Sequence, residues 1–234
     1  MLALSPYERR RWRRAELLRA ALLLLGFLIA SLLDQTLARE VPMSGKVVGA
    51  GAEAAYVRGG DLLRGKDWYQ LLRLAGYLPA WIVVGATMGL AGTVGRRGGD
   101  SGGSGAWLGR GVLLVLGAGL AGLAAEILRV VFRRERPGAA GLYVWDWPWG
   151  PKPAAGWGLP SSHAAVAFGA AFVLARIAPG SGLVLFPLAA GCALSRMLAG
   201  AHFLSDVYLG AVVSYAVCRA ILGTPGARAA LGPR

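Results

Sequence analysis

Residues 194–206 read Leu-Ser-Arg-Met-Leu-Ala-Gly-Ala-His-Phe-Leu-Ser-Asp and connect two apolar runs. Upstream, Arg129 and Arg136 follow another apolar run, and Pro160-Ser161-Ser162-His163 precedes one. Both histidines of the chain therefore lie at the ends of apolar segments, together with three arginines and an aspartate. Charged groups are costly at such places. This placement indicates a functional site within residues 129–206.

The composition is that of an integral membrane protein. Apolar residues make up 56% of the 234 residues, charged residues make up 16%, and the mean hydropathy is +0.52. A soluble domain of this length carries more charge, so we expect the chain to lie in a membrane. The formal net charge of +13 would suggest nucleic acid in a soluble protein. Here the basic residues lie mostly between apolar runs, where they orient helices and attract anionic lipid, so we expect no nucleic-acid partner.

Six apolar segments are candidates for membrane-spanning helices. They cover about residues 17–33, 69–91, 106–128, 162–178, 183–198 and 205–223. A bilayer core of about 30 Å is crossed by about 20 helical residues. The predicted fold class is therefore all-α, a polytopic membrane protein with six transmembrane helices in a single domain, residues 1–234. Pro79 is expected to kink the second helix.

The segments between the apolar runs predict the side on which each helix ends. A basic N-terminal segment, residues 1–14, and a Gly-rich cytoplasmic loop with two arginines, residues 94–106, are typical of the inner side. Residues 34–68 predict an external loop with a short interfacial helix around residues 61–68. A cleaved secretory signal is the alternative interpretation of the first apolar run, but the run is long and further spans follow it.

Counting spans from an inner N-terminus brings the candidate residues to one membrane face. The third and fifth helices end at the outer face, and the fourth and sixth begin there. The residues next to these ends are Arg129, Arg136, His163, Arg196, His202 and Asp206. Arginines at the outer face violate the positive-inside rule, and a functional need for positive charge explains the violation. We expect a bacterial inner-membrane protein whose active site faces the periplasm.

Three arginines and two histidines facing one point describe a pocket for a multiply charged anion, and the guanidinium fork fits phosphate oxygens. Ser161 or Ser162 can cap the helix that begins near His163, so that free N–H groups and the positive helix end face the anion. His202 and Asp206 are spaced i, i+4 and meet if the segment is helical. The carboxylate would then fix one imidazole nitrogen and leave the other as a nucleophile or base.

Taken singly, these residues also have interpretations without catalysis. Arg196 fits a side chain that extends to the headgroup level, and His163 fits a helix cap. Glu126 can simply pair with Arg129 at i, i+3. The combination in chain order is what points to a phosphate-processing site.

Residues outside these motifs are expected to serve packing or contact with lipid. Arg133 and Arg134 fit a surface that binds lipid headgroups, and the tryptophans around Trp157 fit the same level of the bilayer. Cys192 and Cys218 lie inside apolar runs without metal-ligand spacing, so we expect them to be small packing residues.

Three motifs occur in order over about 78 residues: Arg129-x6-Arg136-Pro137, Pro160-Ser161-Ser162-His163 and Ser195-Arg196-x5-His202-x3-Asp206. They resemble the signature of the type 2 phosphatidic-acid phosphatase superfamily, which includes integral-membrane lipid phosphatases, glucose-6-phosphatase and soluble vanadium haloperoxidases. The family usually has lysine where this chain has Arg129, and glycine where it has Ser162. The third motif is complete. Because the chain is not expected to be soluble, the resemblance implies a membrane phosphatase.

The resemblance implies a role for each matching residue. His202 would attack phosphorus and form a phosphohistidine, with Asp206 orienting it, and His163 would protonate the leaving oxygen and then activate water. The groups that would hold the phosphoryl oxygens are Arg129, Arg136, Arg196, Ser161 and the N–H of Ser162. Such a mechanism implies no metal and no cofactor.

We therefore predict a hydrolase that removes the terminal phosphate from a membrane lipid phosphate or pyrophosphate. The candidate substrates are undecaprenyl pyrophosphate, phosphatidylglycerol phosphate, phosphatidic acid and the phosphates of lipid A. Two alternatives stay open: a lipid phosphotransferase on the same scaffold, and a non-enzymatic lipid-phosphate binder or transporter. A binder needs cations but has no use for a histidine paired with a carboxylate, which favours the enzyme.

Overall fold

The computed structural model describes residues 6–40, 46–48, 55–57, 63–94, 103–137, 141–146 and 156–232, and helices dominate it. The long helices are α1 (Pro6–Glu40), α4 (Leu78–Val94), α5 (Gly103–Phe132), α6 (Ser162–Ile177), α7 (Gly182–Leu198) and α8 (Leu204–Leu222). Two short helices, α3 (Asp67–Leu74) and α9 (Pro225–Leu231), and an antiparallel strand pair, β1 (Lys46–Val48) with β2 (Ala55–Val57), complete the described part. The predicted helical class is confirmed, with this strand pair as the exception.

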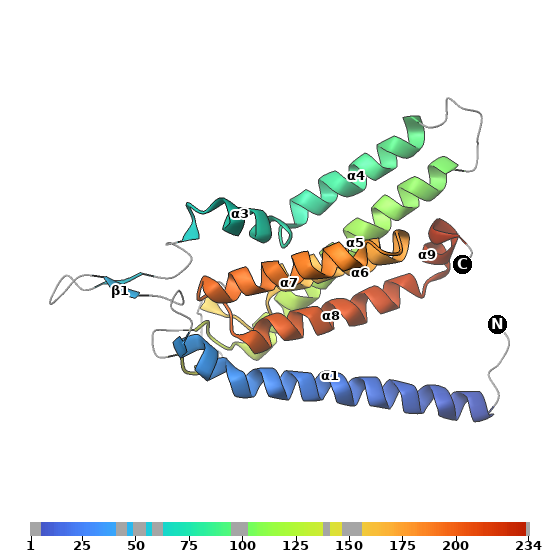
Figure 1. Ribbon diagram of the computed structural model, residues 1–234. Helices are drawn as coiled ribbons and strands as arrows, with labels where there is room; N and C mark the ends of the chain where they lie inside the picture. The colour runs from blue at the N-terminus through green and yellow to red at the C-terminus, as the bar shows by residue number, and fades with distance from the viewer. Residues whose placement is uncertain are drawn as a thin grey trace.

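The long helices form a bundle in which successive helices run in opposite directions (Figure 1). The C-terminal ends of α1, α5 and α7 therefore lie at the same end of the bundle as the N-terminal ends of α6 and α8. We call this the site end. The N-terminal end of α1 and helix α9 lie at the opposite end.

Helix α6 is the centre of the bundle and packs against α5, α7 and α8. Its buried residues are mostly alanines, together with Gly169, and a side chain at Gly169 would come within 2.7 Å of the carbonyl oxygen of Gly117 in α5. Small residues let helix backbones approach closely. The N-terminal end of α6, which carries His163, is therefore held firmly between its neighbours.

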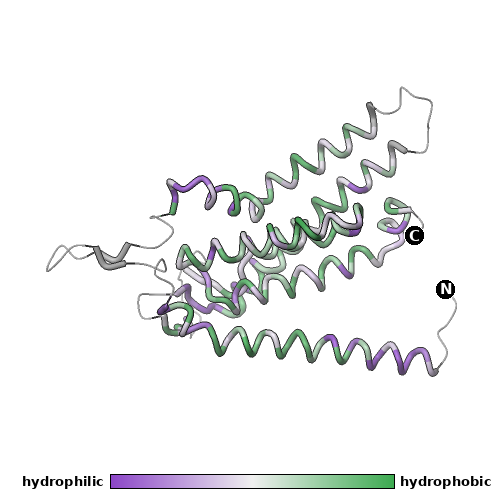
Figure 2. Tube along the Cα trace, viewed as in Figure 1, coloured by the Kyte–Doolittle hydropathy of each residue, from purple (hydrophilic) through white to green (hydrophobic). Residues whose placement is uncertain are grey.

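The outer surface of the bundle is apolar, as a bilayer requires. Large apolar side chains such as Leu18, Leu32, Val83 and Leu123 are exposed on α1, α4 and α5, and hydropathy is highest along the middle of the helices (Figure 2). In the described residues, three helices are long and apolar enough to cross a membrane: Tyr7–Glu40, Gly105–Phe132 and Leu204–Leu222. The bent pair α3 and α4 would make a fourth, and α6 and α7 are shorter apolar helices.

The second predicted span is not one helix. Helix α3 ends at Leu74 and α4 begins at Leu78, and the two are bent by 62°. The break lies before Pro79, so the predicted kink at Pro79 is wrong. Pro79 occupies the first turn of α4, where its missing N–H would have had no helical partner. The Trp81 indole donates to the carbonyl oxygen of Ala75 at 2.7 Å and fastens the bend.

The predicted external loop also differs in its first part. Helix α1 continues to Glu40, and Asp34 is 1% exposed. The continuation is stabilised by contact with the start of α8, which sequence periodicity does not reveal. A helix was predicted around residues 61–68; Leu63 is helical, residues 58–62 lie outside the described part, and α3 begins at Asp67 after a turn. Most of the predicted loop 94–106 also lies outside it, and residues 103–106 already belong to α5.

Candidate active site

The connection between α7 and α8 explains the spacing of the third motif. Gly200 has a φ of 64°, its N–H donates to Met197 O at 2.8 Å, and the Ala201 N–H donates to Arg196 O at 3.0 Å. This is a Schellman motif, which favours glycine at the left-handed position. The chain leaves α7 sharply, and His202 follows at once. The five residues between Arg196 and His202 are therefore the last turn of α7 and its cap.

Asp206 lies in the first turn of α8, and its side chain caps the N-terminus of that helix. One carboxylate oxygen, Oδ2, accepts the N–H of Phe203 at 2.7 Å, which satisfies a donor at the helix start. The main-chain oxygen of Asp206 accepts the N–H of Ser161 at 2.9 Å and ties α8 to the start of α6. The predicted meeting of His202 with Asp206 is confirmed, with His202 Nδ1 at 3.6 Å from Asp206 Oδ2, but His202 precedes the helix instead of lying in it.

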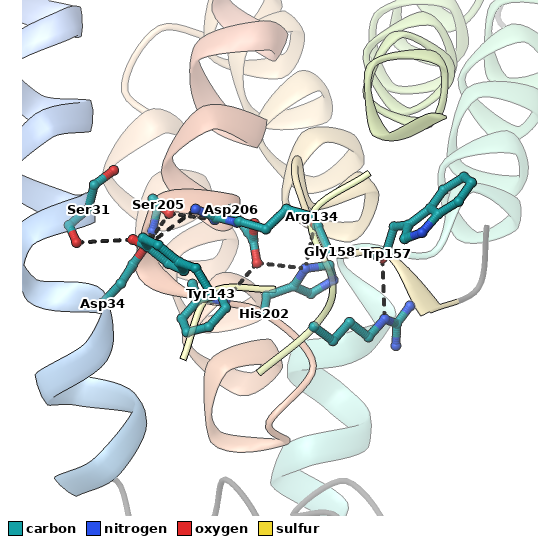
Figure 3. Close-up of polar contacts among 11 residues, drawn as sticks. Ser31, Asp34, Arg134, Tyr143, Trp157, Gly158, His202, Ser205 and Asp206 are labelled. Atoms are coloured by element: carbon teal, nitrogen blue, oxygen red, sulfur yellow. Dashed lines mark hydrogen bonds and ion pairs between the residues drawn. The ribbon is translucent and has the colours of Figure 1, made fainter. Parts of the chain in front are cut away.

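His202 is oriented by a main-chain carbonyl group. Its Nδ1 atom lies 2.9 Å from the oxygen of Gly158 and 3.6 Å from Asp206 Oδ2, and its side chain is buried (Figure 3). A carbonyl oxygen can only accept, so Nδ1 carries the hydrogen and Nε2 keeps its lone pair. Burial lowers the pKa of His202 to about 4, although the Asp206 carboxylate opposes this shift. At neutral pH the imidazole is therefore neutral.

Gly158 fits this place because it has no side chain. A Cβ atom there would come within 2.9 Å of Asp206 Oδ2. Its carbonyl group is positioned by the N–H of Gly158, which donates to Arg134 O at 2.7 Å.

A buried arginine holds Asp206 from the other side. Arg134 Nη2 donates to Asp206 Oδ1 at 2.5 Å and to Ser205 Oγ at 2.6 Å. The Arg134 guanidinium also lies over the rings of Tyr143 and Phe203, at 4.7 and 5.1 Å from their centroids. Such flanking by aromatic rings favours a cation in a buried place. Arg134 therefore fixes the carboxylate that faces His202.

The same network reaches helix α1 through Asp34 (Figure 3). Asp34 accepts the Ser205 N–H at 2.8 Å and the Tyr143 hydroxyl at 2.6 Å, and the Ser205 hydroxyl also donates to it. Arg134 Nη1 lies 3.8 Å from Asp34 Oδ2. One guanidinium thus lies between two buried carboxylates, and α1 is joined to the catalytic end of α8.

Arg133 and Arg134 were predicted to form a headgroup-binding surface, and this is wrong because they are only 3% and 2% exposed. Arg133 ends α5 with a φ of 53°, a left-handed conformation that costs a non-glycine residue about 1–3 kcal/mol. Its side chain pairs with Asp146 at 3.0 Å and lies over the Trp157 ring at 4.4 Å. Trp157, predicted at the headgroup level, is also buried.

The segment after Arg133 is extended and forms main-chain hydrogen bonds with two other segments of the chain. Glu135 N–H donates to Val144 O at 2.8 Å, and Arg136 N–H donates to Gly156 O at 3.1 Å. This small ladder covers the site end of the bundle. It is the element that brings Arg136 and the carbonyl group of Gly158 to the histidines.

The second motif forms the N-terminus of α6. Ser161 is fully buried, and its hydroxyl accepts the N–H of Ala164 at 3.4 Å, so its side chain acts as the cap. The peptide bond between Leu159 and Pro160 is cis. At a helix start, the first N–H groups have no helical partner, which leaves those of Ser162 and His163 at the opening of the helix.

Each of the three motif arginines has a partner within the protein, and two of them also have a buried donor without one in the described part of the chain. Arg129 pairs with Glu126, as the i, i+3 spacing predicts, Arg136 Nε donates to Trp157 O at 3.4 Å, and Arg196 Nη1 donates to Tyr69 Oη at 3.1 Å. The Nε atoms of Arg129 and Arg196 are buried and have no hydrogen-bond partner among the described residues. A buried donor without a partner costs about 1–3 kcal/mol. An anion that accepts from both would recover this energy.

The candidate residues act on one another electrostatically. His163 feels the charges of Arg196, Arg136 and His202, and His202 feels those of Arg196 and Arg136. Arg129 interacts with the Asp206 carboxylate. The structure therefore brings the three motifs together at the site end, as span counting predicts. In the described ranges, no three His, Cys, Asp or Glu side chains gather as metal ligands.

Sequence reasoning missed several residues of this site: Asp34, Tyr69, Arg134, Tyr143 and Gly158. The best available signal was Arg134, which lies in a run of arginines directly after an apolar helix. A second signal was Asp34, the first acidic residue after the first apolar run. Neither signal shows by itself that the charge is buried.

Comparison with known proteins agrees with this geometry. Searches of curated proteins and of solved structures found no match. A family model, the PAP2 superfamily, matches residues 110–229, which is more than half of the chain and includes all three motifs. The membrane-bound members of that superfamily are phosphatases. The chain therefore belongs to the PAP2 superfamily, the type 2 phosphatidic-acid phosphatases, and this supports phosphatase activity on phosphate esters.

Proposed function

We propose that this protein is a lipid phosphatase of the bacterial inner membrane that removes the terminal phosphate from a lipid phosphate or pyrophosphate through a phosphohistidine on His202. The observation that carries the proposal is the state of His202. Its Nδ1–H is held by Gly158 O and faced by Asp206, and its Nε2 keeps a lone pair near Arg196, whose buried Nε has no partner among the described residues.

In the first step, Nε2 of His202 attacks phosphorus, and the bond between phosphorus and the leaving oxygen breaks. Asp206 stabilises the positive charge that develops on the imidazole. Arg129, Arg136, Arg196 and the N–H groups at the start of α6 hold the equatorial oxygens of the phosphoryl group.

His163 serves both steps as an acid and then as a base. It gives a proton to the leaving oxygen in the first step and takes one from water in the second, when water attacks phosphorus and the N–P bond breaks. Its place in the first turn of α6, next to the N–H groups of the helix start, supports this role.

A lipid tail fits beside the bundle. A cavity of about 330 Å³ is lined by Leu22 of α1, Phe168 of α6, Phe186 of α7 and Tyr208 of α8, among others. A smaller pocket is lined by residues of α1 and α7 and by His202. Both lie between α1 and α7 and support a path along which a tail stays in the bilayer while its phosphate reaches His202.

We further propose that all six long helices cross the membrane and that the site end faces the periplasm. The test is labelling of single introduced cysteines, since the native Cys192 and Cys218 are buried. Lys66→Cys at the site end should react with an impermeant maleimide in intact spheroplasts, and Arg10→Cys should react only after permeabilisation. The reverse pattern would place the site in the cytoplasm.

The activity is tested by phosphate release from a panel of lipid phosphates and pyrophosphates in detergent with EDTA, using the wild type and His202→Ala. Release by the wild type alone, with lipid binding retained in the variant, is expected. Transfer of phosphate to an acceptor lipid without free phosphate would indicate a phosphotransferase. Binding without turnover in both proteins would indicate a binder and contradict the proposal.

A further inference from the structure

Arg73 is a cation at the active site that belongs to none of the three motifs. It lies in α3, the short helix that precedes the bend, and its side chain is exposed. Among the residues that the structure describes, none accepts a hydrogen bond from Arg73 or pairs with it as an anion. It lines an open cavity of about 300 Å³ together with Gln70, Leu74 and Tyr77.

Two contacts on either side of Arg73 fix its place. One helical turn before it, Tyr69 is buried and its hydroxyl accepts a hydrogen bond from Arg196 at 3.1 Å. Three residues after it, Gly76 packs so tightly that a Cβ atom would lie 2.8 Å from the Cβ and the oxygen of His163. Residues spaced i, i+4 share a helix face, so Arg73 follows Tyr69 on the face that meets Arg196. Gly76, in the turn after α3, lies against His163. Arg73 therefore stands at the rim of the site, between Arg196 and His163.

Arg73 lies on the side of the leaving group. His163, which donates the proton to the leaving oxygen in the proposed mechanism, feels the charge of Arg73, as does Arg196. The charges that dominate at His202 are those of Asp206, Arg196 and Arg136. In the proposed mechanism, the three motif arginines already hold the transferred phosphoryl group. Arg73 adds a fourth guanidinium near His163, and because it is exposed it is suited to bind a second anionic group.

Resting on the proposed function, we propose that Arg73 binds the second phosphate of a lipid diphosphate and makes the enzyme selective for diphosphates over monophosphates. In this reaction, His202 takes the terminal phosphoryl group, the bond from its phosphorus to the bridging oxygen breaks, and His163 protonates that oxygen. The leaving group is a lipid monophosphate, whose remaining charged oxygens Arg73 holds. When the substrate is a lipid monophosphate, the leaving group is a neutral alcohol, which gives Arg73 nothing to bind.

The test compares farnesyl diphosphate with farnesyl monophosphate, which share one tail, in wild type, Arg73→Ala and Arg73→Lys. Charge-assisted hydrogen bonds are strong, so Arg73→Ala should lower kcat/KM for the diphosphate by about 10- to 100-fold and for the monophosphate by less than about 3-fold. Arg73→Lys should lie between, because lysine keeps the charge but loses the fork. Arg176→Ala removes one charge at the opposite end of α6 and should change neither substrate.

Equal losses on both substrates, or no loss on the diphosphate, would overturn the inference. A binding measurement separates this result from failure of the phosphatase proposal. His202→Ala should bind a farnesyl methylenebisphosphonate at least about 10-fold more tightly than the same variant carrying Arg73→Ala. If the wild type hydrolyses neither substrate, the phosphatase proposal fails. If Arg73→Ala leaves bisphosphonate binding unchanged, the role of Arg73 fails.

Discussion

On the nucleophile side of the site, five side chains, none more than 3% exposed, hold one another before any substrate binds: His202, Asp206, Arg134, Ser205 and Asp34. On the leaving-group side, formed by His163 and Arg73, neither side chain is held by a hydrogen bond or ion pair with another residue in the described part of the chain. The comparison teaches that the protein fixes the direction of attack in advance and leaves donor capacity where charge arrives with the substrate.

The largest effect is expected from breaking the nucleophile side. Arg134→Met would leave the carboxylates of Asp34 and Asp206 buried without their shared cation, and loss of one partner of a buried ion pair costs about 3–5 kcal/mol. We expect a large fall in the melting temperature in detergent and loss of activity. Adding Asp34→Asn should recover part of the melting temperature, because it removes one of the two buried charges.

The control for this variant is Arg10→Met, which removes an exposed arginine at the far end of α1. Its melting temperature should equal that of the wild type. If Arg134→Met also melted with the wild type, the buried network would not be what stabilises the site end.

The next effect separates the two sides. His163→Asn should lower kcat/KM, which reports the phosphoryl transfer to His202, about 10²- to 10⁴-fold on a lipid phosphate, because the leaving alkoxide needs a proton. The loss should be much smaller on p-nitrophenyl phosphate, whose leaving group departs without one. His202→Ala should abolish turnover of both substrates. Equal losses for His163→Asn on both substrates would argue against its role as the acid.

A smaller effect concerns stability and pH. The pKa of His202 is lowered by burial from 6.5 to about 4 in the folded protein, so between these values the unfolded chain binds a proton that the folded protein does not. Stability should therefore fall as the pH falls from about 6.5 to about 4. His202→Gln lacks this contribution, so its melting temperature should fall less over the same range. Parallel curves for the two proteins would show that His202 is not buried in its neutral form.

The sequence predicted the convergence of the motifs because helix direction alternates along the chain. Arg129, His163, Arg196 and His202 all lie at helix ends, and span counting needs only the order of those ends. The short gap between Arg196 and His202 could also be read as a turn, since Gly200 supplies the left-handed residue that a helix cap favours.

The rest depended on contacts between distant segments. The sequence around Arg134 is equally consistent with an arginine that faces lipid headgroups and with one that lies between two carboxylates. The extended segment after α5 determines that Arg134 is buried. Asp34 follows an apolar run and fitted the start of a loop, but its bonds to Ser205, 171 residues away, keep α1 helical around it. The bend before α4 likewise reflects packing of Gly76 on His163, which no local pattern encodes.

In the proposed mechanism, His202 is the residue that carries the phosphoryl group. The most direct measurement is mass spectrometry of the His163→Asn variant after brief reaction with p-nitrophenyl phosphate and an alkaline quench, conditions under which phosphohistidine survives. Because this variant lacks the base that activates water, we predict a peptide with one phosphoryl group on His202, and no such peptide from His202→Ala. Phosphate release by the wild type without any modified His202, or a phosphoryl group on another residue, would contradict the account.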